Sequence, residues 1–271
     1  MGNRIVSIGG GNMGSAIIGG LLAQGYNKDL ISIVEPNAET RTKLTQELGV
    51  DVEPKISSLK KADVVLLAVK PQIMQSVVEQ LAPLINRRRP LFISIAAGVT
   101  TTQLASWISQ EVPIVRVMPN TPSLVGRGAA ALFATANVSR VERELAQTVI
   151  SAVGLAEWVD KEDLLDIVTA LSGSGPAYYF LIIELLEKIS IELGLDAALA
   201  RKLSIETAHG AALLARQSTS SPGTLREQVT SPGGTTERAL KVLSDGNLEM
   251  LLRDALTAAH QRSRELAEGM E

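Results

Sequence analysis

The chain of 271 residues contains no cysteine and only two histidines, and aromatic residues make up 3% of it. Without cysteine it has no disulfide, no thiol nucleophile and no cysteine-ligated metal, which fits a reducing compartment. His209 and His260 both fall inside predicted helices, where a lone histidine is usually structural. We therefore expect neither a metal site nor histidine-based catalysis.

The chain also lacks an excess of positive charge and a long hydrophobic run. It has 26 basic and 29 acidic residues, for a net charge of −3, which does not favour binding to nucleic acid or to an acidic membrane. No apolar run reaches the roughly 20 residues that span a bilayer, and the N-terminus lacks the pattern of a signal peptide. We expect a cytoplasmic protein that binds neither nucleic acid nor membrane.

The first part of the chain alternates between short β-branched runs and helical patterns. Strands are predicted at 4–9, 30–34, 63–69, 91–98, 114–118, 130–134 and 157–159, and helices at 13–25, 39–49, 72–85 and 101–108. Apolar strands that alternate with helices are typical of a parallel sheet covered on both faces. The predicted fold class is thus α/β, with a Rossmann-type doubly wound sheet in residues 1–160.

From residue 161 onward the strands stop, and residues 161–271 are predicted to form an all-α domain. Pro176 suits the first turn of a helix, Asp196 suits an N-cap, and the last helix is expected at about 247–268. The stretch AYYFLIIELL at 177–186 is apolar on every side of a helix. Such a surface is typical of burial against a second copy of the chain, which predicts a homodimer.

A glycine-rich loop follows the first predicted strand. Gly9, Gly11 and Gly14 fit the pattern G-x-G-x-x-G between a strand and a helix, which is the context of a dinucleotide fingerprint. In that fingerprint Gly9 makes the tight turn, Gly11 lets the backbone approach a pyrophosphate, and Gly14 lets the helix pack on the strand. The pyrophosphate lies at the helix N-terminus. A simple glycine-rich turn is the less favoured alternative.

The residues after the second strand leave the choice of dinucleotide open. Glu35 stands about 20 residues after the last glycine of the fingerprint, where an acid binds the adenosine ribose and favours NAD over NADP. However, Asn37, Thr40 and Arg41 lie just beyond and have the chemistry to hold a 2′-phosphate.

The scarcity of histidine favours reduction of an imine over reduction of a carbonyl. A carbonyl becomes an alkoxide and usually needs a positioned acid, whereas a protonated imine becomes a neutral amine when hydride is added. Gly233 and Gly234 permit exposed backbone amides before a predicted helix that begins near Thr235 and Thr236. Amides at a helix start bind a carboxylate. The alternative interpretation is an ordinary helix start capped by serine or threonine.

Six motifs together resemble the pyrroline-5-carboxylate reductase family: IGGGNMGSAIIGGLL at 8–22, AVKPQ at 68–72, SIAAGVT at 94–100, MPNTP at 118–122, SGSGPAY at 172–178 and SPGGTT at 231–236. They follow the family's order and span the whole chain. The resemblance implies reduction of 1-pyrroline-5-carboxylate to L-proline, the last step of proline biosynthesis, with NADPH (NADP) or with NADH (NAD). It implies a Rossmann domain, a helical dimerisation domain, and dimers that assemble into decamers.

The resemblance also implies the roles of individual residues. The pyrophosphate loop is Ile8, Gly9, Gly10, Gly11, Asn12, Met13 and Gly14, and Glu35 and Asn37 lie by the adenosine ribose. The nicotinamide side is lined by Ala68, Val69, Lys70, Pro71, Ile95, Ala96 and Ala97. The substrate carboxylate is held by Ser231, Gly234 and Thr235, the catalytic Thr236 bonds the ring nitrogen, and Glu162 lies near the substrate across the dimer. The acidic Glu35 departs from the neutral or basic segment common in the family.

Two other classes of protein share parts of this pattern. A two-domain hydroxyacid dehydrogenase needs a lysine on the helix after the SGSG loop, but no lysine follows Gly175 until Lys188. A non-enzymatic NAD(P)-sensing module has no need of the SPGGTT motif. An imine reductase accounts for both features.

Overall fold

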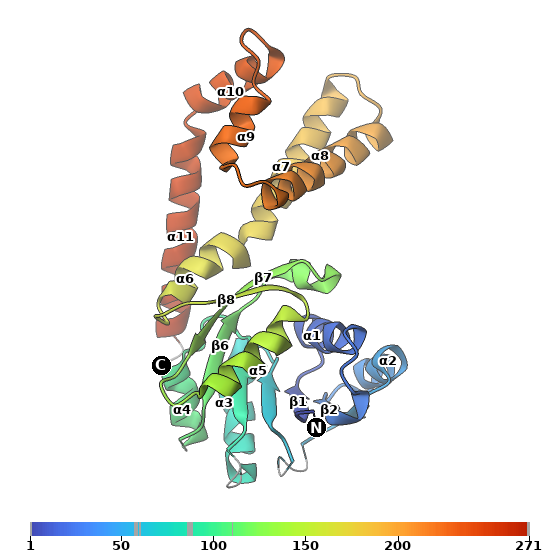
Figure 1. Ribbon diagram of the computed structural model, residues 1–271, viewed down its shortest axis with the longest axis vertical. Coiled ribbons are helices and arrows are strands. Elements are labelled where there is room, and N and C mark those ends of the chain that lie inside the picture. Colours follow the sequence, from blue (N-terminus) through green and yellow to red (C-terminus); the bar gives the residue numbers. More distant parts are fainter. Residues whose placement is uncertain (1, 57–58, 60, 86–88, 110, 270–271) are drawn as a thin grey trace. The chain divides into compact units, whose positions relative to one another are not determined.

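The structure, a computed structural model, describes residues 2–269 except 57, 58, 60, 86–88 and 110. The chain forms two compact units (Figure 1). The first unit comprises Met1–Ser174 and Ala259–Glu271, and the second unit comprises Gly175–Ala258. Among the described residues, no helix is both long and apolar enough to cross a membrane.

The first unit is built on a sheet with strand order β3-β2-β1-β4-β5-β6-β7-β8. The strands are β1 Ile5–Ile8, β2 Ile31–Val34, β3 Asp51–Glu53, β4 Val64–Leu67, β5 Leu91–Ser94, β6 Ile114–Met118, β7 Gly128–Ala134 and β8 Gly154–Trp158. All neighbouring strands run parallel except β6 and β7, which are antiparallel. The predicted parallel sheet is thus present, and it contains one antiparallel pair that was not predicted.

Helices cover both faces of the sheet, which confirms the doubly wound arrangement (Figure 1). One face packs against α1 Asn12–Ala23, α2 Ala38–Leu48 and α5 Arg140–Ser151, and the other against α3 Pro71–Leu81 and α4 Thr101–Ile108. Short 3-10 turns cover Lys28–Leu30, Ala82–Leu84 and Thr121–Val125. The strand order reverses between β1 and β4, and ligands of such sheets bind at the carboxyl ends of the strands beside this point.

The helix starts follow local sequence signals. Thr100 caps α4 and Ser139 caps α5, each in a capping box with the side chain three residues on. Asn37 caps α2 by accepting a hydrogen bond from the Thr40 amide, and α2 ends at Gly49 with φ of 64°, a left-handed conformation that favours glycine. The Asn37 and Thr100 caps fix where two of the loops at the carboxyl edge of the sheet end.

The second unit is wholly helical. It contains α7 Gly175–Glu192, α8 Ala197–Gln217, α9 Pro222–Gln228, α10 Thr235–Asp245 and the beginning of α11 Leu248–Glu268. Pro176 lies in the first turn of α7, and Asp196 caps α8, as predicted. In the single chain α7 exposes large apolar side chains, including Tyr179, Phe180, Leu181, Ile182, Leu185, Leu186 and Ile189.

The boundary between the units differs from the expected division into residues 1–160 and 161–271. The first unit continues through α6 Leu164–Val168 and the π-helical turn Thr169–Gly173. It also includes the end of the chain from Ala259 onward. The reason is packing and hydrogen bonding, because α6 lies against β6 and β7. In addition, Asp166 on α6 accepts a hydrogen bond from Ser263 of α11 at 2.7 Å.

Candidate active site

The glycine loop after β1 lies against the end of β4. Gly9 has φ of +101°, and a Cβ there would come within 2.6 Å of the Ala68 carbonyl oxygen. A Cβ at Gly14 would come within 2.9 Å of the Ala68 Cβ. Only glycine permits this approach, so Gly9 and Gly14 fix the loop and the first turn of α1 on the β4 strand end.

Gly11 differs from these two glycines because the space around it is open. No atom of the described residues lies within 4 Å of the Cβ that a side chain would place there. Gly11 is the N-cap of α1 and no side chain caps this helix, so its first amides are available to an anion. A dinucleotide pyrophosphate fits this open, amide-lined start of a helix.

Glu35 joins the glycine loop to the loop after β2. Its Oε2 accepts a hydrogen bond from the Gly10 amide at 3.1 Å, and its Oε1 accepts one from the Asn37 amide at 2.9 Å. The Arg41 guanidinium donates to the carbonyl oxygens of Glu35 at 3.1 Å and Pro36 at 2.7 Å. The acid expected beside the ribose is thus next to the pyrophosphate loop, and Arg41 serves to hold the β2–α2 loop.

The loops after β4 and β5 leave the same edge of the sheet. The Ala68 amide donates to the Ile8 carbonyl at 2.8 Å, and the Ile95 amide donates to the Leu67 carbonyl at 3.2 Å. Lys70 is the N-cap of α3, with Pro71 at its first position. The structure therefore brings the residues predicted to bind the cofactor to the carboxyl ends of β1, β2, β4 and β5 within the first unit.

The SPGGTT loop belongs to the second unit and leads into α10. Gly233 has φ of +72°, and its amide donates to Glu237 Oε2 at 2.8 Å. The N-cap of α10 is Gly234, with no side-chain cap. Thr236 occupies the second position of the helix and does not cap it, so the alternative of a threonine-capped helix start was wrong. Within the described part of the chain, the Thr236 hydroxyl has no hydrogen-bond partner.

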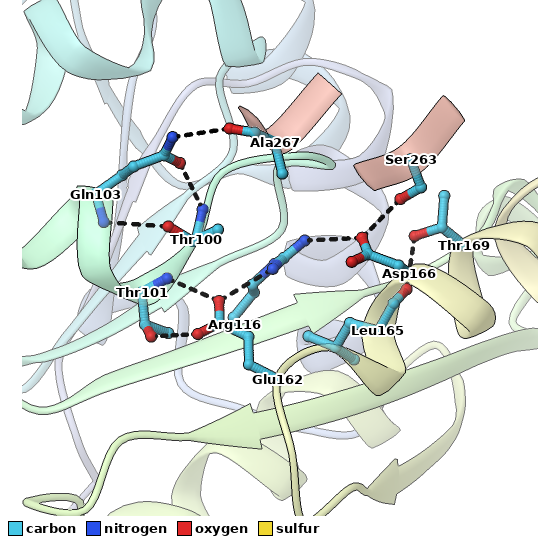
Figure 2. Close-up of polar contacts among 10 residues, drawn as sticks. All are labelled: Thr100, Thr101, Gln103, Arg116, Glu162, Leu165, Asp166, Thr169, Ser263 and Ala267. Atoms are coloured by element: carbon cyan, nitrogen blue, oxygen red, sulfur yellow. Dashed lines mark hydrogen bonds and ion pairs between the residues drawn. The ribbon is translucent and has the colours of Figure 1, made fainter. Parts of the chain in front are cut away.

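Glu162 lies in a cluster of polar side chains inside the first unit. Its Oε1 accepts hydrogen bonds from the Thr101 amide at 2.8 Å and from Arg116 Nη1 at 3.0 Å, and its Oε2 accepts one from Thr101 Oγ1 at 2.5 Å. Figure 2 shows Glu162 and Asp166 directed at the Arg116 guanidinium from two sides. A carboxylate with three donors of its own unit has little capacity left for a substrate.

Comparison with known proteins assigns the chain to a family. Residues 162–266 match the family described as pyrroline-5-carboxylate reductase dimerisation, and residues 4–98 match NADP oxidoreductase, coenzyme F420-dependent. A pyrroline-5-carboxylate reductase of Pseudomonas aeruginosa is 47% identical over 98% of this chain and 97% of its own length. The chain belongs to the pyrroline-5-carboxylate reductase family. The resemblance drawn from the six motifs is thereby confirmed.

Solved structures of the family share the fold over nearly the whole chain. The pyrroline-5-carboxylate reductase of Coxiella burnetii has a TM-score of 0.92 and 43% identity, and covers 98% of both chains. The enzyme of Plasmodium falciparum, solved with NADP bound, has a TM-score of 0.84 and 28% identity, also over 98% of both chains. The fold class, with a Rossmann-type sheet and a helical dimerisation region, is confirmed.

Several residues of the first unit were missed by sequence reasoning. Thr101, Arg116, Asp166 and Ser263 form the cluster around Glu162, although they are far apart in the sequence. A single arginine within the apolar strand IVRVM was the available signal, since a buried guanidinium requires carboxylate partners. The positions of those partners depend on the tertiary fold.

Proposed function

We propose that this chain reduces 1-pyrroline-5-carboxylate to L-proline, the last step of proline biosynthesis. NADPH is the proposed reductant, with NADH as the alternative. The observation that carries the proposal is the Thr236 hydroxyl, which has no hydrogen-bond partner among the described residues, at the uncapped start of α10. The chain also matches reductases of this name along almost all of its length. The relatives' names support the substrate, and the open glycine loop supports a dinucleotide.

The first unit supplies the cofactor side of the proposed reaction. The amides at the start of α1 would hold the pyrophosphate, and Glu35 and Asn37 would bind the ribose. The loops after β4 and β5, with Ala68, Val69, Lys70, Pro71, Ile95, Ala96 and Ala97, line the nicotinamide, which supplies hydride when bound. The chain's own contribution is to bind and orient the ring and to exclude water from it.

The second unit supplies the substrate side. The hydroxyl of Ser231 and the amide of Thr235 hold the substrate carboxylate. The Gly234 amide donates to the Ser231 carbonyl at 3.0 Å, so this glycine shapes the loop rather than binding the substrate with its amide. The Thr236 hydroxyl both donates and accepts hydrogen bonds, which suits the ring nitrogen before and after reduction. A protonated imine becomes a neutral amine, so this site needs no histidine.

Assembly and location complete the proposal. The chain carries the dimerisation region of its family, and α7 exposes an apolar surface in the single chain. We propose a homodimer as the basic unit, dimers that assemble into decamers, and a cytoplasmic location.

The proposal is tested by following oxidation of NADPH and of NADH with 1-pyrroline-5-carboxylate as substrate. Turnover that yields proline is the expected result. Binding of either dinucleotide without turnover would instead support the NAD(P)-sensing module. Oxidation of a hydroxy acid with NAD+ or NADP+ as the hydride acceptor would support the dehydrogenase.

A further inference from the structure

The start of α4 is held by a side chain from a distant part of the sequence. Helix α4 begins at Thr101, directly after the loop 95–100 that follows β5. Both donors of Thr101, its amide and its hydroxyl, bind the two oxygens of the Glu162 carboxylate, at 2.8 Å and 2.5 Å. An anion at a helix N-terminus is further favoured by the helix dipole. Glu162 therefore fixes where the loop 95–100 ends.

Arg116 fixes Glu162 in turn. Its side chain is only 5% exposed, and it projects from β6, an inner strand of the sheet. Nη1 lies 3.0 Å from Glu162 Oε1, and Nη2 lies 3.9 Å from Asp166 Oδ1, which also accepts the Ser263 hydroxyl (Figure 2). One buried guanidinium thus orients two carboxylates, and a buried charge of this kind moves only if its partners move with it.

A second contact ties the same turn of α4 to the end of the chain. Gln103 closes the capping box with Thr100 and donates through Nε2 to the Ala267 carbonyl at 3.0 Å. The loop 95–100 is consequently fixed at one end by β5 and at the other by the Glu162 and Gln103 contacts. Both ends of the loop are therefore held, and the end at Thr101 shifts only if this cluster opens.

We propose that Arg116 is a positioning residue for hydride transfer, acting through Glu162 and Thr101 on the loop 95–100. The inference rests on the proposed function, in which Ile95, Ala96 and Ala97 line the nicotinamide. It also gives Glu162 a positioning role in place of direct contact with the substrate. A displacement of about 1 Å at a reacting group lowers the rate by about 100-fold, so a loop held this firmly matters for the chemical step.

The test uses Thr101→Val, which removes one hydrogen bond to Glu162 and keeps the backbone amide. Arg116→Lys is the second variant, because lysine keeps the charge but cannot serve two carboxylates with a planar fork. Thr101→Ser restores the hydroxyl and should rescue the activity lost in Thr101→Val. Arg140→Met, which breaks an exposed arginine–glutamate pair on α5, is the matched control for loss of an ion pair.

Three measurements are made on each full-length variant: kcat, the isotope effect with NADPH deuterated at the transferred hydrogen, and affinity for 2′-phospho-ADP-ribose, which lacks the nicotinamide ring. For Thr101→Val and Arg116→Lys we expect kcat to fall about tenfold and the isotope effect to rise, with affinity for the ring-less fragment unchanged. Thr101→Ser and Arg140→Met should match the parent chain.

The proposal is overturned if folded Thr101→Val and Arg116→Lys keep the parent kcat and isotope effect. It is also overturned if these variants lose affinity for 2′-phospho-ADP-ribose and thermal stability but keep the parent kcat when saturated with cofactor. That result would show that the cluster only stabilises the fold. Failure of the proposed function is distinguishable, because the parent chain itself would then fail to reduce 1-pyrroline-5-carboxylate.

Discussion

The Glu237 carboxylate accepts a hydrogen bond from the Gly233 amide, with 2.8 Å between Oε2 and the nitrogen. This bond closes the SPGGTT loop over the start of α10, where no side chain caps the helix. Glu237 thereby binds a backbone amide before the helix, a role that a capping threonine has in other helices. The hydroxyl of Thr236 is left available for another partner.

Thr236→Val should lower kcat/KM without unfolding the protein. Valine keeps the volume of threonine and removes the hydroxyl, and a hydrogen bond to a charged group contributes about 1.5–3 kcal/mol. Kcat/KM for 1-pyrroline-5-carboxylate should therefore fall by roughly 10- to 150-fold. Steady-state kinetics and NADPH titration check the result, and cofactor affinity should stay unchanged.

Ser221→Ala is the matched control for Thr236→Val. Ser221 does cap its helix, because its hydroxyl accepts a hydrogen bond from the Thr224 amide at 3.1 Å at the start of α9. Loss of this cap should reduce the free energy of unfolding by about 1 kcal/mol and leave turnover normal. Normal kcat/KM in a folded Thr236→Val protein would contradict the catalytic role.

Gly11→Val and Gly14→Val should affect different properties of the protein. Space is open around Gly11, so its valine variant should fold normally and lose at least about tenfold in NADPH affinity, or about 1.4 kcal/mol. A Cβ at Gly14 would lie 2.8 Å from the Gly9 carbonyl oxygen, so that variant should lose about 1–3 kcal/mol of stability. Thermal melts and NADPH titration separate the two effects. Unchanged affinity in Gly11→Val would place the pyrophosphate elsewhere.

Glu35→Ser should shift the choice of cofactor toward NADPH. The Glu35 carboxylate lies beside the glycine loop and repels a 2′-phosphate, and two unit charges about 4 Å apart interact by roughly 4 kcal/mol near a protein surface. Screening reduces this, so the ratio of kcat/KM for NADPH to that for NADH should rise on the order of tenfold. Glu35→Gln removes the charge but keeps an acceptor for the Gly10 amide, and thus separates repulsion from loop disruption. A constant ratio in both variants would show that Glu35 does not face the ribose.

Ile182→Glu should dissociate the assembly. Ile182 is 50% exposed in the single chain and lies in the apolar surface of α7, and an unpaired charge buried in an interface costs several kcal/mol. Sedimentation should show a shift toward monomer at micromolar concentration, with loss of turnover. Gln46→Glu, on the exposed surface of α2, is the control for the added negative charge, because it too changes the net charge by −1. An active monomer would contradict burial of α7 between copies.

Most of the fold could be predicted from local sequence signals, and the errors have identifiable causes. The helix α5 was missed although Ser139 and Glu142 form a capping box before Ala146, Val149 and Ile150, which face the core. The strand β3 has only three residues and lies at the sheet edge, so its periodicity is too short to detect. The antiparallel β7 follows from the short connection after β6, since parallel strands need a crossover of about a dozen residues or more.

The candidate site was predictable where its residues are consecutive and not where they are assembled by the fold. The glycine loop was predicted correctly because a side chain at Gly9 or Gly14 would clash with Ala68 at the end of β4, so both positions need glycine. The partners of Glu162 were not predicted, because Thr101 and Arg116 come into hydrogen-bonding distance of Glu162 only when β5, β6 and α6 pack together. Spacing along a chain reports local geometry and carries no signal for such contacts.

The first unit resumes at Ala259 after the whole of the second unit has intervened, and this order has a consequence for folding during synthesis. Ser263 donates a hydrogen bond to Asp166, and the Ala267 carbonyl accepts one from Gln103, yet both residues are synthesised after the whole second unit. At about 5–20 residues per second, the nascent cofactor-binding sheet waits several seconds or more with these two bonds unmade. The sheet is therefore synthesised before the second unit but completed only after it, by residues of α11.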